Sequence, residues 1–211
     1  DMVVAVDGNL GSVIHEGIAS RRLQVSVTTG GGHSWGDFGV ASAIHALGRM
    51  IADISHLEVP KQPRTTYNVG VISGGTSINT IAQQAEMFID MRSTCSESLA
   101  HLEQQVRSIL ELHAKGLNLQ IEVVGDRPGG ALPSDHELVQ QANEILTALG
   151  ISPSSAPSST DANVPLSQGV PAICIGITNG RGAHRLDESL DIRPIPKGMA
   201  QLAGLLLTLL S

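Results

Sequence analysis

Two kinds of apolar pattern occur along this chain of 211 residues, and they predict two kinds of β-sheet. Residues 2–6 and 172–177 are continuous apolar runs, which are typical of strands buried in a parallel sheet. Leu23, Val25 and Val27 instead alternate with polar residues, which indicates a strand with one buried face. The chain is therefore expected to combine an α/β part with a part built on an antiparallel sheet.

The middle of the chain predicts a compact mixed module. Further strands are expected at residues 67–72, 85–91 and 117–123. Apolar residues at helical spacing predict helices at residues 40–54 and 99–110. Thr94 and Glu97 have the spacing of a capping box at the start of the second helix. The order strand, helix, strand, strand, helix, strand favours a four-stranded antiparallel sheet with two helices on one face.

The pattern changes after the Arg-Pro-Gly-Gly sequence at residues 127–130. Ser134 and Glu137 form a second capping-box spacing, and an apolar stripe predicts a helix at residues 138–149. A last helix is expected from about Lys197. Together these patterns predict an α/β portion with an inserted α+β module. The predicted segments are residues 1–18, 19–128 and 129–211.

Charge and composition exclude several classes of protein. The net charge of −7 argues against a nucleic-acid surface, which needs clustered lysine and arginine. The apolar tail at residues 202–210 is much shorter than the roughly 20 residues that a membrane span requires. Cys95 and Cys174 are isolated, which fits a reducing compartment. We therefore expect a cytoplasmic protein with neither a nucleic-acid nor a membrane partner.

A glycine-rich loop at residues 29–39 presents several unusual side chains together. Three consecutive glycines lead into His33, the only tryptophan of the chain (Trp35) and Phe38. Glycine gives such a loop access to backbone conformations that other residues rarely adopt. Two interpretations stay open: His33 caps or packs locally in a strand-to-helix turn, or it is presented for chemistry.

Asp7 and His184 each follow a predicted buried strand. Ligands in open α/β sheets bind at the carboxyl ends of strands, and a carboxylate with an imidazole is a donor pair suited to zinc. The alternative makes Asp7 a turn residue and His184 a solvated loop residue.

Other polar residues have similarly divided interpretations. Thr160 and Asp161 are predicted to lie at a loop-to-helix junction, where they either form an ordinary helix cap or belong to a site. Asn79 belongs to a plain turn or presents its amide to a substrate. Arg92 and Arg127 end their strands, where they clamp a carboxylate or are merely solvated.

These motifs, taken together, resemble the zinc-dependent peptidases that include aminoacylase, acetylornithine deacetylase, carboxypeptidase G and peptidase T. The resemblance covers essentially the whole chain, and its motifs follow the family's order. They are residues 31–39 (GGHSWGDFG), 42–47 (SAIHAL), 74–81 (GGTSINTI), 90–92 (DMR), 159–165 (STDANVP) and 182–188 (GAHRLDE).

The resemblance implies an α/β catalytic-domain portion with an inserted lid domain that mediates homodimerisation. Asp7 corresponds to the acidic ligand of one zinc ion and His184 to the histidine ligand of the other. His33 corresponds to a lid histidine that enters the partner subunit's active site and polarises the scissile carbonyl.

The resemblance also implies substrate-binding residues. Asn79 and Arg127 match lid positions that contact substrate, and Arg92 is a further candidate. Thr160 and Asp161 match a loop that borders the pocket.

The family's His-x-Asp motif and Glu-Glu pair do not occur in this sequence. The resemblance therefore implies the C-terminal half of a di-zinc peptidase or amidohydrolase acting on small peptides or N-acyl amino acids. Without those residues we expect the chain to be inactive alone. The alternative is a non-catalytic dimerisation or peptide-binding module.

Overall fold

The computed structural model describes residues 1–183 and 185–209, and the chain divides into two compact units. The flanking unit comprises Asp1–Ile18 and Pro128–Ser211, and the inserted unit comprises Ala19–Arg127. Each unit has its own apolar core.

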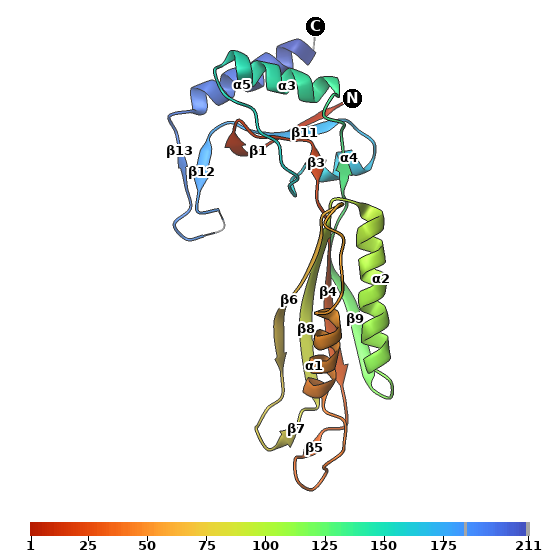
Figure 1. Ribbon diagram of the computed structural model, residues 1–211. Helices are drawn as coiled ribbons and strands as arrows, with labels where there is room; N and C mark the ends of the chain where they lie inside the picture. Colours follow the sequence, from red (N-terminus) through yellow and green to blue (C-terminus); the bar gives the residue numbers. More distant parts are fainter. Residues whose placement is uncertain (184, 210–211) are drawn as a thin grey trace. The chain divides into compact units, whose positions relative to one another are not determined.

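The inserted unit is a four-stranded antiparallel sheet covered by two helices on one face, as the sequence predicts (Figure 1). The strand order is β6-β8-β4-β9. Its strands are β4 (Ala19–Thr28), β6 (Thr65–Gly74), β8 (Gln84–Ser93) and β9 (Asn118–Arg127). The helices are α1 (Ala43–Ile54) and α2 (Ser96–His113).

Alternation along β4 explains why this sheet has one covered face. Leu23, Val25 and Val27 are completely buried, whereas the residues between them are only partly covered. Leu47 of α1 and Val106 of α2 are completely buried in the same core. Each such side chain contributes about 1.5–3 kcal/mol when it leaves water, so this stripe pattern holds the helices on the sheet.

The start of α2 differs from the predicted capping box. Cys95, and not Thr94, is the N-cap residue, and it makes no side-chain capping bond. The hydroxyl of Ser93 accepts a hydrogen bond from the Cys95 main-chain N at 3.1 Å. Ser93 is buried and also shares a hydrogen bond with Thr65 at 2.9 Å, so the side-chain contact at this helix start comes from a strand residue and not from Thr94.

The second predicted capping box is also wrong. Helix α3 (Glu137–Ala148) begins after His136, whose Nδ1 accepts a hydrogen bond from the Leu138 main-chain N at 3.2 Å. Ser134 is not the N-cap residue because it lies within a turn that is closed by the hydrogen bond from His136 N to the Pro133 carbonyl, and the helix starts after this turn.

The flanking unit contains a three-stranded sheet in the order β1-β11-β2. Strand β1 (Val3–Leu10) runs parallel to β11 (Ala172–Gly176), and β2 (Val13–Ile14) is antiparallel to β11. Helices α3 and α5 (Ile195–Leu209) pack together with this sheet, and α4 (Asn163–Ser167) contributes to a second small core.

The strands formed by the two continuous apolar runs differ in how deeply they are buried. Strand β11 is buried along its whole length, as predicted. Strand β1 was expected to be equally buried, but Met2, Val3 and Val6 are 38–47% exposed. The reason is that β1 pairs with β11 along one edge only, so it is an edge strand in this chain.

Short pairs of strands complete the fold. In the inserted unit β5 (Gly32–His33) pairs with β7 (Thr80–Ile81). In the flanking unit β3 (Glu16–Gly17) pairs with β10 (Gly130–Ala131), and β12 (Asn179–Arg181) with β13 (Ser189–Asp191). Within the described part of the chain, no helix has the length and apolarity needed to cross a membrane.

Candidate functional site

The pairing of β5 with β7 brings His33 and Asn79 together at one end of the inserted unit, which we call the tip. His33 lies opposite Thr80 in this pairing. The Ser34 main-chain N donates a hydrogen bond to the Asn79 carbonyl at 3.0 Å. Two candidate residues separated by 46 positions in the sequence therefore become neighbours through main-chain bonds.

The His33 ring is oriented by its own loop. Its Nδ1 accepts hydrogen bonds from the main-chain N atoms of Trp35, at 3.2 Å, and Gly36, at 3.3 Å. A neutral imidazole that accepts at Nδ1 carries its proton on Nε2. Local capping and presentation for chemistry are therefore compatible, because the capping bonds leave Nε2–H as a donor on an exposed side chain.

The glycines before His33 are needed for this loop. Gly31 has φ +65° and Gly32 has φ +154°, both of which favour glycine. A Cβ on Gly32 would lie 2.8 Å from the Asp37 Cβ. Asp37 in turn accepts a hydrogen bond from the His33 main-chain N at 2.7 Å, so the close approach fixes the backbone beneath the imidazole.

The side chain of Asn79 is also oriented. The Ser77 hydroxyl donates a hydrogen bond to Asn79 Oδ1 at 2.7 Å. This bond uses one of the two acceptor positions of Oδ1 and leaves both N–H donors of Nδ2 available to a ligand.

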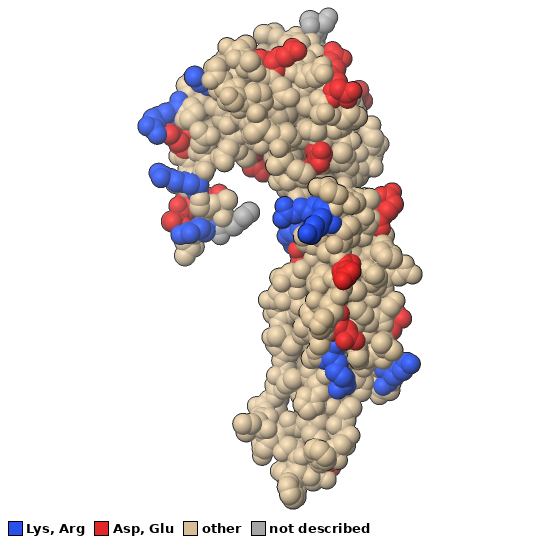
Figure 2. All heavy atoms as spheres, in the orientation of Figure 1, with Lys and Arg blue, Asp and Glu red and all other residues tan. Residues whose placement is uncertain are grey.

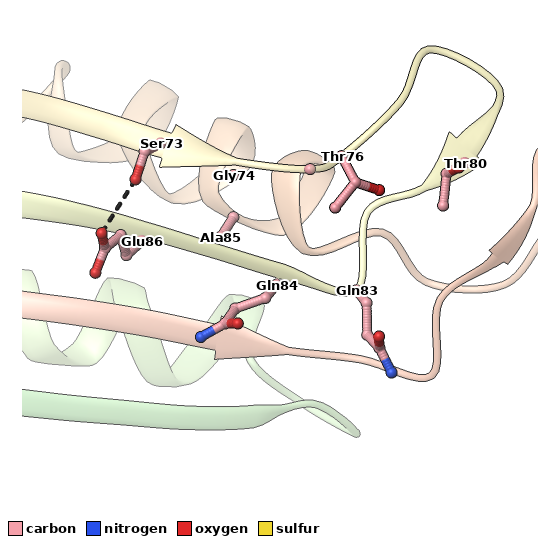
Figure 3. Close-up of a pocket in the computed structure, with 9 residues that line it drawn as sticks. Ser73, Gly74, Thr76, Thr80, Gln83, Gln84, Ala85 and Glu86 are labelled. Carbon is pink, nitrogen blue, oxygen red and sulfur yellow. Dashed lines mark hydrogen bonds between the residues drawn. The ribbon is translucent and has the colours of Figure 1, made fainter.

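A separate polar hollow of about 400 Å³ lies near the same end of the sheet (Figure 3). Both carboxylate oxygens of Glu86 are used there, by Ser73 at 3.1 Å and by Gln24 at 2.9 Å. Its remaining walls are hydroxyl and amide side chains, two glycines and Ala85.

Arg92 and Arg127 lie at the opposite end of the sheet from the tip. Both pair with Ser20 of β4, one from each side. From Ser20 to Thr28 the strand extends roughly 26 Å at 3.3 Å per residue, and the chain then continues to His33. The structure therefore brings the two arginines together but separates them from His33 and Asn79 within one inserted unit.

Arg92 is engaged with a neighbouring carboxylate. Its Nε donates to Asp90 Oδ2 at 2.7 Å, and Arg22 Nε donates to Asp90 Oδ1 at 2.9 Å. Partial burial raises the pKa of Asp90, but these two hydrogen bonds and charges outweigh it and hold the pKa below its ordinary value. Arg92 is thus already bound to a carboxylate in the protein.

In the flanking unit, Asp7, Thr160 and Asp161 surround the buried thiol of Cys174. Burial raises the pKa of Cys174, and the charge of Asp7 raises it further. The Cys174 Sγ donates to the Asp7 carbonyl at 3.4 Å, and the Thr160 hydroxyl bonds to the thiol. The thiol is thus kept neutral. The structure therefore brings three of the predicted site residues together.

Thr160 and Asp161 differ in their surroundings. Thr160 is buried, and its hydroxyl accepts from the Ala162 main-chain N at 3.2 Å. It is not the cap of α4, because the N-cap residue is Ala162 and no side chain makes a capping bond there. Asp161 is exposed.

Asn163 is a residue that the sequence analysis missed. It is completely buried, and its Nδ2 donates to the carbonyls of Ile18 and Pro128 at 2.9 Å each. Its Oδ1 accepts from the Thr160 main-chain N at 2.8 Å. One amide therefore positions the Thr160 loop against Ile18 and Pro128, the two residues at which the flanking unit joins the inserted unit. The signal available in the sequence was an amide directly after Thr-Asp-Ala.

The predicted metal site can be compared with the described residues only in part. Asp7 does not follow β1 as predicted but lies within it, directly after Val6, where the regular pairing with β11 is interrupted. Its carboxylate is exposed, and Oδ1 accepts a hydrogen bond from its neighbour Gly8 N at 2.7 Å. Such a carboxylate fits zinc as a ligand. In residues 1–183 and 185–209, however, no three histidine, cysteine or acidic side chains form a group that could hold a metal. The other predicted ligand, His184, lies outside the described residues.

Comparisons with known proteins agree with the fold. A peptidase dimerisation domain model matches residues 13–118. The chain is 28% identical over 193 residues to an acetylornithine deacetylase of Myxococcus xanthus, covering 85% of this chain and 50% of that protein. The chain thus spans about half the length of the curated relatives that it matches.

Two solved structures have the same fold. Aminopeptidase PepT from Bacillus cereus has a TM-score of 0.86 at 21% identity, covering 100% of this chain and 57% of PepT. A tripeptidase from Staphylococcus aureus has a TM-score of 0.84 at 19% identity, covering 97% and 56%. The family model matches half of the chain and extends from β2 to the start of β9. The chain belongs to the M20 peptidase family and carries its dimerisation domain.

Proposed function

We propose that this chain provides the dimerisation lid and a C-terminal portion of the catalytic domain of a di-zinc peptidase or amidohydrolase. The enzyme hydrolyses the amide bond of small peptides or N-acyl amino acids in the cytoplasm. Membership of the M20 family and the similarity to a deacetylase and to peptidases support this proposal.

The observation that carries the proposal is the separation of candidate substrate contacts within one inserted unit. His33 and Asn79 lie at the tip, whereas Arg92 and Arg127 lie at the other end of β4. A small substrate cannot span the roughly 26 Å of strand between them. A homodimer resolves this, because the tip of one copy then serves the active site of the other.

Each of the candidate site residues in the inserted unit has a defined part in the reaction. The Nε2–H of His33 donates to the oxygen of the scissile amide carbonyl, where negative charge develops. The NH₂ of Asn79 donates to a substrate carbonyl. Arg92 and Arg127 contact the substrate from the other copy.

Zinc supplies a Lewis acid and a more acidic bound water when it is present. Asp7 would hold one zinc ion and His184 the other, together with further ligands from outside this sequence. Thr160 and Asp161 border the pocket and orient the loop next to Asp7. The chain alone is proposed to be inactive, since the general-base glutamate of this chemistry has no counterpart in its sequence.

A complementation experiment tests this arrangement. In the full-length protein that carries this chain, loaded with zinc, His33→Ala and Asp7→Ala each abolish hydrolysis of a panel of dipeptides, tripeptides and N-acyl amino acids. Mixing the two variants after subunit exchange restores about a quarter of wild-type activity, because half of the dimers are mixed and each has one intact site.

Other outcomes separate the possible failures. Activity that is absent from the wild-type protein with every substrate rejects the hydrolase. Activity in the wild type that the mixture does not recover rejects the shared site.

A non-catalytic dimerisation or peptide-binding module is the second candidate. It is favoured by the match of a peptidase dimerisation domain model to residues 13–118. Peptide binding by a wild-type protein that hydrolyses nothing would support it.

A further inference from the structure

A groove of about 780 Å³ lies at the tip, next to His33 and Asn79. We call it the tip groove. Its apolar walls are Phe38, Val40, Ile44, Ile78 and Ile81, which come from the loop after β5, the start of α1 and the β7 segment. Ser34, which follows His33, and the residues on both sides of Asn79 line it as well.

The tip groove is apolar where the molecule meets water. Phe38 is 91% exposed and Ile78 is 102% exposed. On the face drawn in Figure 2, the end of the inserted unit that carries β5 and β7 shows almost no charged side chains. Exposed apolar side chains gathered in one place mark a binding surface more often than scattered ones do.

The charge of the tip groove indicates what it binds. Arg49 of α1 lines it, together with His45, and no acidic side chain does. Within the described part of the chain, the Arg49 guanidinium makes no hydrogen bond or ion pair. An unpaired arginine beside apolar walls is complementary to a small molecule with a carboxylate and an apolar group.

The size of the groove favours a small molecule over a second protein. Its volume lies within the roughly 300–1,000 Å³ of small-molecule sites. Protein interfaces of standard size bury about 800 Å² on each partner over a much broader surface.

We propose that the tip groove selects the substrate. It takes a small peptide or N-acyl amino acid whose apolar side chain packs on Ile78 and Phe38 and whose free carboxylate pairs with Arg49. This inference rests on the proposed function, in which His33 and Asn79 meet the amide bond of the same substrate. Ile78 is the specificity-determining residue, because it directly precedes Asn79.

Binding to the 211-residue chain tests the proposal without catalysis, because the whole groove lies in the inserted unit. The probes are N-acetyl-leucine, N-acetyl-glycine and N-acetyl-leucinamide. Calorimetry is combined with the emission of Trp35, which is the only tryptophan of the chain and is 87% exposed. N-acetyl-leucine should bind about fivefold more tightly than the amide, as expected for an exposed ion pair. It should bind about tenfold more tightly than N-acetyl-glycine.

Two variants assign these preferences to named residues. Arg49→Gln should remove the preference for the acid over the amide. Ile78→Ser should remove the preference for leucine over glycine. The matched controls are Arg64→Gln and Leu112→Ser, which change exposed side chains of the same unit outside the groove and should leave both preferences unchanged.

Three results overturn the proposal. The first is no heat and no change in Trp35 emission with any probe, and the second is a preference that survives both variants. The third is a probe affinity that weakens as the protein concentration rises, which shows that a second copy competes for the tip groove. Hydrolysis by the full-length protein is measured separately. Binding with the expected preferences but without hydrolysis therefore rejects the proposed function and keeps the groove.

Discussion

The side-chain oxygen of Asn163 accepts a hydrogen bond from the main-chain N of Thr160 at 2.8 Å, inside the flanking unit. This bond fixes the loop that carries Thr160 and Asp161 next to Cys174. Because Asn163 is completely buried, water cannot replace the bond if the side chain is removed.

We therefore expect Asn163→Ala to be strongly destabilising. It removes three buried hydrogen bonds and leaves the carbonyls of Ile18 and Pro128 without this donor. The free energy of unfolding should fall by about 3 kcal/mol. Urea denaturation of the chain measures it, with the exposed Asn118→Ala as control. A loss below about 0.5 kcal/mol, the usual size of a surface effect, would show that the amide has no structural role.

Two helical glycines should respond in opposite ways to the same substitution. A Cβ on Gly198 of α5 would lie 2.0 Å from the Ile177 carbonyl oxygen, whereas a Cβ on Gly48 of α1 meets nothing within 4 Å. Gly198→Ala should lower the free energy of unfolding by about 1–3 kcal/mol through overpacking. Gly48→Ala should raise it by about 0.5–1 kcal/mol, because alanine favours a helix. Thermal denaturation of both variants checks the signs, and equal shifts would contradict the close approach of α5 to Ile177.

The ion pairs of Asp90 should make stability depend on pH in the acid range. A pKa held below the ordinary value of 3.8 means that the folded state binds its proton more weakly than the unfolded state. The contribution is therefore present above pH 3.8 and is lost as the pH falls through the lowered pKa. Because Arg22 and Arg92 are 56% and 43% exposed, we expect at most about 1 kcal/mol.

Urea denaturation of the wild type and Asp90→Asn at pH 6 and pH 2.5 measures this contribution. The wild type should be the more stable protein at pH 6, and the difference should shrink at pH 2.5. If the difference in the free energy of unfolding between the two proteins is the same at both pH values, it does not come from the charge of Asp90.

The Ser77 hydroxyl should act as a positioning group for Asn79. Ser77→Ala removes the bond to Asn79 Oδ1 and lets the amide rotate. In the full-length enzyme kcat/KM should fall about fivefold, the equivalent of one ordinary hydrogen bond. Ser77→Thr should restore it, since the hydroxyl is retained. Ser73→Ala serves as the control because its hydroxyl bonds to Glu86 instead. An unchanged kcat/KM in Ser77→Ala would remove Asn79 orientation from the mechanism.

The sequence predicts the inserted unit well because one physical rule governs it. Alternation along β4 and β8 and helical spacing in α1 and α2 both report which side faces the core. The same rule fails for β1. A continuous apolar run indicates a buried strand, but it does not say whether a neighbouring strand lies along each edge.

The candidate site is less predictable because its geometry depends on register. Nothing in the sequence shows that Arg92 and Arg127 meet across Ser20, far from the tip, until the strands pair. Capping boxes were misplaced for a related reason. Ser93 and His136 supply the polar groups at the helix starts. The three-residue spacing of a capping box does not show that a neighbouring residue can take the place of the predicted one.

The two bonds that Asn163 donates have a consequence for the modular history of this chain. Its single Nδ2 reaches the carbonyls of Ile18 and Pro128, so the points where the inserted unit departs and returns are two hydrogen-bond lengths apart at most. Because these junction residues lie so close together, the flanking unit can accept, lose or exchange an inserted domain without a change in its own core. A short turn that joins residues 18 and 128 in place of the inserted unit should therefore leave the β1-β11-β2 sheet of the flanking unit intact.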